Sequence, residues 1–294
     1  MYEKILVPLD CSELAEMALP YAEELAVRLG SEVTLLCVRE PADIHSPRLY
    51  ECYLQDVVRR TKEEAVKGLG KLTAKEIEVK PVVLSGDPAE TIVDYADKEK
   101  SGLVIMVTHG RSGVGRWLVG SVADKVIRAT QQPVALIRAT GVRPVVQKKG
   151  ILKNMLVPLD GSKTGETALP YAEELATRLK AGITLLRVFD PGYWTSHMAL
   201  VEQVESMRAS ARDYIEKMAA QLQKKGIAAK AEFQQARTTD VAEEIIRVAD
   251  EISADLVVMS THGESGVSRW VFGSVAERVL KGGSTPLMLV RALS

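Results

Sequence analysis

Short apolar runs alternate along the chain with longer stretches in which apolar residues recur every three or four positions. The run at 103–107 is apolar throughout, which is typical of a strand buried on both faces of a parallel sheet. The stretch at 12–28 has helical spacing, and Ser12 suits the N-cap of the predicted helix. Pro20 lies inside that stretch, so we predict a kink or a break there.

The same alternation predicts five strands in each half of the chain, with helices between them. The expected strands are 4–9, 32–38, 78–84, 103–107 and 133–137, followed by 154–159, 182–188, 228–234, 256–259 and 286–290. In the first half, further helices are expected within 47–72, at 88–98 and from about Gly120. Strands alternating with helices predict an α/β fold: two Rossmann-like domains, each a five-stranded parallel sheet with helices on both faces.

The two halves are copies of one another, because several segments recur in the same order. The matching segments are 6–10 with 156–160, 18–26 with 168–176, 108–110 with 261–263, and 120–123 with 273–276. Between the copies lies a stretch with glycine, proline and basic residues and no hydrophobic period, which is typical of a linker. We therefore predict a domain at 1–138, a linker at 139–150 and a second domain at 151–294.

Composition excludes several classes of function. The chain has 38 basic and 39 acidic side chains and a net charge of −1, so it lacks the positive field that nucleic-acid binding needs. No apolar run is long enough to span a membrane, and the first residues lack a signal-peptide pattern. The three cysteines lie in the first half without metal-ligand spacing. We expect reduced thiols, a cytoplasmic location, and no nucleic-acid, membrane or metal partner.

Two segments carry candidate chemistry, and both follow predicted strands at the end where doubly wound sheets bind ligands. Asp10 ends the first strand, and a glycine-rich loop at 110–121 follows the fourth. Glycines let backbone N–H groups approach an anion, and a helix beginning at Gly120 and Ser121 adds further donors. The Ser121 hydroxyl can cap this helix and bind a phosphate oxygen. The alternatives are that Asp10 caps the first helix and that the loop residues only shape the turn.

These segments resemble the universal stress protein family over nearly all of both copies. The motifs that carry the resemblance are ILVPLD, the strand endings LLCV and LLRV, and VIMVTHGRSGVGRWLVGSVADKVI with its partner VVMSTHGESGVSRWVFGSVAERVL. Family members that bind ATP share the pattern Gly, two residues, Gly, nine residues, Gly-Ser/Thr. Both copies match its second and third elements, and Val107 and Ser260 stand where the first glycine is expected.

The resemblance implies an adenine nucleotide α-hydrolase-like fold and an ATP site in each copy, with accompanying Mg²⁺ left open. Asp10 and Pro8 would border the adenosine, and Val38 and Met106 would line the adenine pocket. In the first copy the expected ligand-binding residues are Pro8, Asp10, Val38, Met106, Val107, Gly110, Gly120, Ser121 and Val122. In the second copy they are Pro158, Asp160, Val188, Met259, Ser260, Gly263, Gly273, Ser274 and Val275.

The copies differ in charge beside the predicted phosphate site, with Arg111 in the first and Glu264 in the second. An arginine attracts a triphosphate and a carboxylate repels it, so we expect the first site to bind at least as well as the second. The resemblance also implies that the copies pair within one chain through their last strands, Val134–Ile137 and Leu287–Val290. It leaves open whether whole chains form a homodimer.

The leading hypothesis is an ATP-binding stress or regulatory protein with at most weak ATPase activity. The sequence shows no good general base, arginine finger or lysine-bearing loop for phosphoryl transfer. A second hypothesis is a nucleotide-independent interaction module with vestigial sites. A third is an α-hydrolase enzyme, which would need an SGG-type loop after the first strand, and residues 10–13 read DCSE instead.

Overall fold

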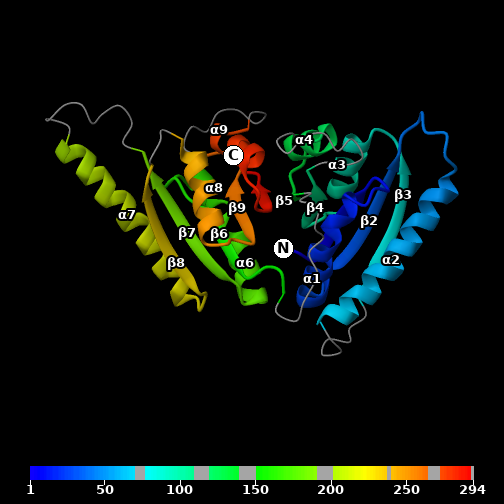
Figure 1. The fold of residues 1–294 in the computed structure, drawn as a ribbon, viewed down its shortest axis with the longest axis horizontal. Helices are drawn as coiled ribbons and strands as arrows, with labels where there is room; N and C mark the ends of the chain where they lie inside the picture. Colours follow the sequence, from blue (N-terminus) through cyan, green and yellow to red (C-terminus); the bar gives the residue numbers. More distant parts are fainter. Residues whose placement is uncertain are drawn as a thin grey trace. The chain divides into compact units, whose positions relative to one another are not determined.

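The computed structural model contains two compact units, residues 1–151 and residues 152–294 (Figure 1). Its described residues are 1–69, 77–108, 119–138, 150–190, 201–236, 240–263 and 272–292. Apart from Gly150, the expected linker at 139–150 lies outside these residues. The pairing expected between the last strands of the two copies stays a prediction.

In the described part of the first unit, five parallel strands run in the order β3-β2-β1-β4-β5. The strands are β1 (Lys4–Leu9), β2 (Glu32–Arg39), β3 (Val79–Ser85), β4 (Leu103–Val107) and β5 (Val134–Ile137). The helices are η1 (Ala15–Ala18), α1 (Leu19–Leu29), α2 (Pro47–Leu69), α3 (Pro88–Lys98) and α4 (Ser121–Ala129).

The described part of the second unit repeats this arrangement, with its parallel strands in the order β8-β7-β6-β9-β10. The strands are β6 (Asn154–Pro158), β7 (Gly182–Phe189), β8 (Ala229–Gln235), β9 (Leu256–Ser260) and β10 (Leu287–Val290). The helices are α5 (Lys163–Glu166), α6 (Leu169–Leu179), α7 (Val201–Lys224), α8 (Val241–Glu251) and α9 (Ser274–Gly282). The predicted α/β class, with two Rossmann-like units, is confirmed.

Each sheet reverses its winding at its middle strand. In the first unit β1 pairs with β2 on one side and with β4 on the other. The chain therefore leaves β1 toward β2 and β3, and later returns past β1 to add β4 and β5. Helix α1 contacts α2, and α3 contacts α4, as expected for helices that cover the sheet in two pairs. The loops after β1 and β4 consequently diverge, and this leaves space between them at the carboxyl ends of the strands.

Burial follows from each strand's place in its sheet. Every residue of β4 is buried because neighbouring strands flank it and helices cover its faces, which explains its unbroken apolar sequence. Strand β3 lies at the edge of the first unit's sheet, and its side chains are mostly partly or fully exposed. Pro81 lies in this edge strand, where the missing N–H costs no hydrogen bond within the sheet.

The helix predicted from Ser12 to Arg28 is not continuous. A short 3-10 turn, η1, comes first, and α1 then begins at Leu19 with Pro20 in its first turn. Proline fits the first turn because the N–H groups there have no partner inside the helix. The second unit has the same break between α5 and α6.

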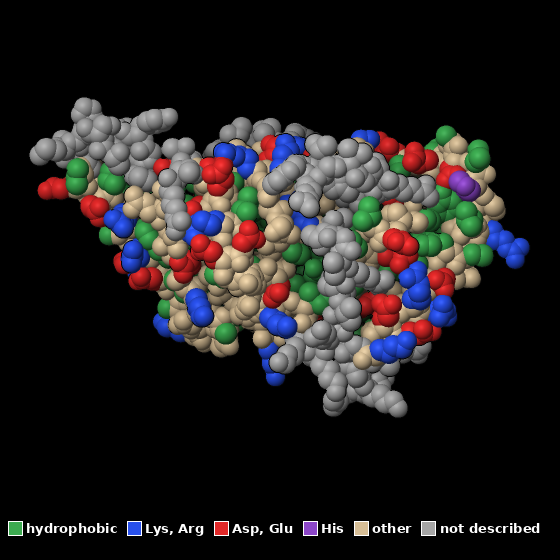
Figure 2. All heavy atoms as spheres, in the orientation of Figure 1, with side chains coloured by type: hydrophobic (Ala, Val, Ile, Leu, Met, Phe, Trp, Pro, Cys, Tyr) green, Lys and Arg blue, Asp and Glu red, His purple; other side chains and the backbone are tan. Residues whose placement is uncertain are grey.

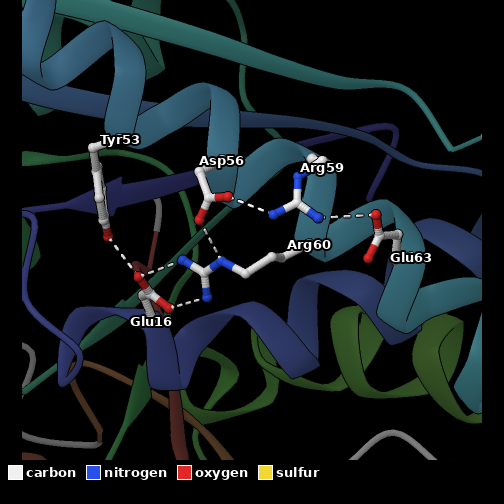
Figure 3. A network of polar contacts seen from close by, with 6 residues as sticks. All are labelled: Glu16, Tyr53, Asp56, Arg59, Arg60 and Glu63. Atoms are coloured by element: carbon white, nitrogen blue, oxygen red, sulfur yellow. Dashed lines mark hydrogen bonds and ion pairs between the residues drawn. The ribbon is translucent and has the colours of Figure 1, made fainter.

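A buried carboxylate joins η1 to α2 (Figure 3). Arg60 of α2 donates two parallel hydrogen bonds to the Glu16 carboxylate, at 2.8 and 3.0 Å, and the Tyr53 hydroxyl donates a third at 3.1 Å. Only 10% of the Glu16 side chain is exposed. Burial, together with the Glu16 charge, raises the pKa of the Tyr53 phenol well above its ordinary value, so this phenol stays a donor. The network fixes η1, which begins at Ala15, shortly after the predicted site residue Asp10.

Charged side chains elsewhere are interspersed, with both signs present on the face that Figure 2 shows. Exposed pairs of this kind contribute little each, because water screens them. Within the described ranges, no helix combines the length and the apolar character needed to cross a membrane.

We predict that Arg60→Ala lowers the free energy of unfolding of the first unit by about 1–2 kcal/mol, because Glu16 stays buried without its bidentate partner. The matched control is Arg59→Ala on the same helix, since the Arg59 side chain is 60% exposed and pairs with exposed carboxylates. Urea unfolding, with hydrogen exchange of η1 and α2 peptides, measures both. Equal effects of the two substitutions would contradict a special role for the buried pair.

Candidate functional site

A cavity of about 560 Å³ lies at the carboxyl ends of β1, β2 and β4 in the first unit. Eight of the nine residues expected in this copy line it: Pro8, Asp10, Val38, Met106, Val107, Gly120, Ser121 and Val122. The ninth, Gly110, lies outside the described residues, as do His109 and Arg111. The structure thus brings together residues that are far apart in the sequence. Their role in ligand binding stays a prediction.

Local hydrogen bonds hold the Asp10 carboxylate in place. Its Oδ1 accepts from the backbone N–H of Ser12 at 3.1 Å and from the Ser12 hydroxyl at 2.5 Å. The Ser12 Oγ in turn accepts from the backbone N–H of Ala15 at 3.1 Å. The carboxylate therefore has a defined orientation at the cavity wall, between the carboxyl ends of β2 and β4.

The α4 helix starts at the cavity, but its cap differs from the expectation. Gly120 is the N-cap and Ser121 is the first helical residue, with no side-chain cap hydrogen bond. The prediction that the Ser121 hydroxyl caps the helix is wrong, because that residue already has helical geometry. The backbone N–H of Gly120 donates to the Thr108 carbonyl at 2.6 Å, which ties the helix start to the end of β4. N–H groups in the first turn of a helix lack partners inside it and suit an anion.

Sequence reasoning missed a polar cluster that also lines this cavity. The backbone N–H of His45 donates to Asp43 Oδ1 at 2.8 Å, and His45 Nδ1 lies 2.6 Å from the same oxygen. The Tyr50 hydroxyl donates to Asp43 Oδ2. These hydrogen bonds, the one from Tyr50 first, hold the pKa of Asp43 far below its ordinary value. The position of this cluster after the end of β2 could have indicated a site. Sequence analysis missed it because the cluster lies outside the repeated motifs.

The second unit has a cavity of about 290 Å³ in the corresponding place. All nine residues expected in this copy line it: Pro158, Asp160, Val188, Met259, Ser260, Gly263, Gly273, Ser274 and Val275. Asp160 repeats the arrangement of the first unit, accepting from the N–H of Ser162 at 2.9 Å and from its hydroxyl at 2.6 Å. Glu264, which we expected to weaken this site, lies outside the described residues.

Two glycines enclose the Asp160 carboxylate. A Cβ atom added to Gly263 would overlap Asp160 Oδ2, and one added to Gly165 would overlap Oδ1. Neither glycine has a positive φ, so space rather than backbone geometry requires them. Gly263 is the second glycine of the family pattern. In this unit it brings the loop after β9 against the aspartate.

The two units have different residues where the family pattern has its first glycine, Val107 in the first and Ser260 in the second. Val107 is 7% exposed and presents an apolar side chain to the first cavity. In the second unit the Ser260 hydroxyl accepts from the backbone N–H of His262 at 3.1 Å and also donates to the His262 carbonyl. The hydroxyl therefore stabilises the turn. His262 lines the cavity, and its Nδ1 lies 3.0 Å from the Thr261 hydroxyl.

A positive charge lies in the second cavity, and sequence reasoning missed it. Arg187 of β7 lines this cavity and donates from Nη1 to the Leu159 carbonyl at 3.4 Å. Its Nε is buried and has no hydrogen-bond partner within the described part of the chain. The first unit has Cys37 at the corresponding place in β2. The sequence did indicate this feature, because Arg187 is a charged residue in a strand of mostly apolar residues.

Comparison with known proteins assigns the fold and these segments to a family. The sequence profile of the universal stress protein family matches residues 1–138 and again residues 152–291. The chain belongs to the universal stress protein family. It carries two such domains in tandem, as the internal repeat predicted.

Relatives of two lengths agree with the duplication. Universal stress protein MJ0577 of Methanocaldococcus jannaschii is 30% identical over 155 residues, which span 47% of this chain and 96% of that protein. A universal stress protein of Mycolicibacterium smegmatis is 24% identical over 297 residues, spanning 98% of this chain and 96% of its own. The crystal structure of a universal stress protein from Archaeoglobus fulgidus covers all of both chains at 20% identity with a TM-score of 0.66, which shows the shared fold.

We predict that Gly263→Ala displaces the Asp160 side chain and destabilises the second unit by about 1–2 kcal/mol through overpacking. Gly182→Ala is the matched control, because a Cβ there meets its nearest neighbour at 3.5 Å, an ordinary contact. Urea unfolding and a crystal structure of each variant test this. An unmoved Asp160 in the Gly263 variant would contradict the close packing.

Proposed function

We propose that both domains of this universal stress protein bind an adenine nucleotide, ATP, and that the protein acts as a nucleotide-dependent regulator in a stress response. The observation that carries the proposal is the order of chemical groups along each cavity. Apolar side chains at the end of the second strand are followed by a fixed carboxylate at the end of the first. The start of a helix follows at the end of the fourth strand.

This order corresponds to the parts of a nucleotide in the first unit. Leu36 and Val38 offer an apolar surface for a flat base at the end of β2. Asp10 accepts hydrogen bonds, which suits ribose hydroxyls. The backbone N–H groups and the Ser121 hydroxyl at the start of α4 suit phosphate oxygens. The three zones follow the strand order β2, β1, β4, so one extended ligand can contact all of them.

Nucleotide binding without efficient hydrolysis fits the described lining. The described residues around the first cavity include Asp10, Glu40 and Asp43 but no lysine or arginine. Stabilising a transferring phosphoryl group usually requires such cations. The paired Asp43 and His45 follow β2, at the end assigned to the base, and α4 begins at the other end. ATP would then act as a ligand that orders the surrounding loops.

The two cavities support unequal affinities. The first has about 560 Å³ and the second about 290 Å³, against roughly 300–1,000 Å³ for typical small-molecule pockets. Arg187 of β7 puts a charge at the end of the second cavity that is assigned to the uncharged base, where the first unit has a thiol. We propose that the first domain holds the complete nucleotide more tightly than the second.

The direct test is to denature the purified full-length protein and identify released small molecules by mass spectrometry. We expect adenine nucleotide, and a rise in the unfolding temperature when Mg-ATP is added to emptied protein. Release of no nucleotide together with no thermal shift would reject the proposal and favour a nucleotide-independent interaction module.

Two substitutions assign the binding to each cavity. Gly120→Leu fills the helix start in the first domain, and Gly273→Leu does so in the second, where a Cβ already meets the Thr261 carbonyl at 3.0 Å. Both glycines have φ near −60°, so the backbone itself tolerates a side chain. We expect each variant to lose nucleotide from its own domain and the double variant to lose all of it. If the folded double variant retained as much nucleotide as the unchanged protein, the ligand would bind elsewhere.

A further inference from the structure

Two cysteine side chains lie close together behind the first cavity. Cys11, which follows Asp10 after the end of β1, has its Sγ 3.9 Å from the Sγ of Cys37 in β2. Cys11 is partly exposed, Cys37 is only 1% exposed, and neither is in a disulfide. A disulfide has a sulfur–sulfur distance of about 2.0 Å, so the atoms must approach each other by roughly 1.9 Å. Side-chain rotation with a small backbone shift can supply that movement.

The backbone at Cys11 is unusual for a residue with a side chain. Its φ is 63°, in the left-handed region that favours glycine. The second unit has Gly161 at the corresponding place, with φ of 86°. It also has Arg187 where the first unit has Cys37. The first unit therefore carries a thiol in a conformation that disfavours side chains, and a second thiol beside it.

We propose that Cys11 and Cys37 are a redox modification site that closes to an intramolecular disulfide in the first domain. The oxidant is hydrogen peroxide. The partly exposed Cys11 thiolate attacks a peroxide oxygen, an S–O bond forms as the O–O bond breaks, and hydroxide leaves. The Cys37 thiolate then attacks the sulfenic sulfur, an S–S bond forms as the S–O bond breaks, and a second hydroxide leaves. With the two thiol protons, the products are one disulfide and two waters, and a small dithiol reverses the change.

The disulfide would act on the first cavity through the backbone. Cys11 follows Asp10, and Cys37 lies between Leu36 and Val38, and these three neighbours line the cavity. Drawing the sulfurs together shifts both segments, including the aspartate held by Ser12. This consequence rests on the proposed nucleotide site. We expect oxidation to weaken retention in the first domain by about fivefold or more and to leave the second domain unchanged.

The experiment uses the full chain with Cys52→Ser as the reference, because Cys52 is exposed and can cross-link separate molecules. The reference protein is treated with hydrogen peroxide, alkylated and digested. We expect the intact oxidised protein to be about 2 Da lighter than the reduced protein. After digestion we expect a pair of peptides joined through Cys11 and Cys37, and dithiothreitol should reverse both changes. Nucleotide retention is measured separately on reduced and oxidised protein, so failure of the nucleotide proposal leaves the disulfide result readable.

Two single-thiol variants complete the test. In the reference background, Cys37→Ser should leave a Cys11 sulfenic acid that dimedone traps. Cys11→Ser should leave the buried Cys37 largely unreacted. Oxygen addition at Cys11 without the cross-link in the reference protein would overturn the proposal, as would faster oxidation of Cys37 than of Cys11.

Discussion

The reversal of winding at the middle strand is the constraint on which the candidate sites depend. Because β1 pairs with β2 on one side and β4 on the other, the connections leave it in opposite directions and leave the strand ends uncovered between them. The first cavity lies there, where Asp10 follows β1 and α4 begins beside the end of β4. The position of the cavity and the proposed nucleotide chemistry both depend on that topology.

The two units share this arrangement but differ in side chains near the cavities. Both units keep an aspartate fixed by a serine two residues later and a helix capped by glycine. They differ in the second strand of each unit, where Cys37 in β2 and Arg187 in β7 occupy corresponding positions. A charged side chain in one domain and a thiol in the other give the two sites different chemistry within one fold. We propose unequal affinity and a redox response confined to one domain on the basis of this difference.

The strands and the repeat could be predicted because they depend on local patterns. The apolar run 103–107 became β4 with the same bounds, since a strand buried on both faces has no polar positions. The break near Pro20 was also predictable, because proline suits only the first turn of a helix. The Ser121 cap was wrong, because the local sequence does not decide whether Gly120 or Ser121 takes the first helical geometry. The cluster around Asp43 escaped prediction because it occurs outside the repeated segments.

The sequence alone determined that the chain holds two α/β domains of one family, because periodicity, repeats and motifs are encoded residue by residue. It also identified the aspartates and glycines at the strand ends. Tertiary structure alone decided that the two thiols lie 3.9 Å apart and that Arg187 enters the second cavity. Such contacts depend on which strands become neighbours and on side-chain direction. The sequence of a single segment determines neither of these, because both arise when distant segments pack together.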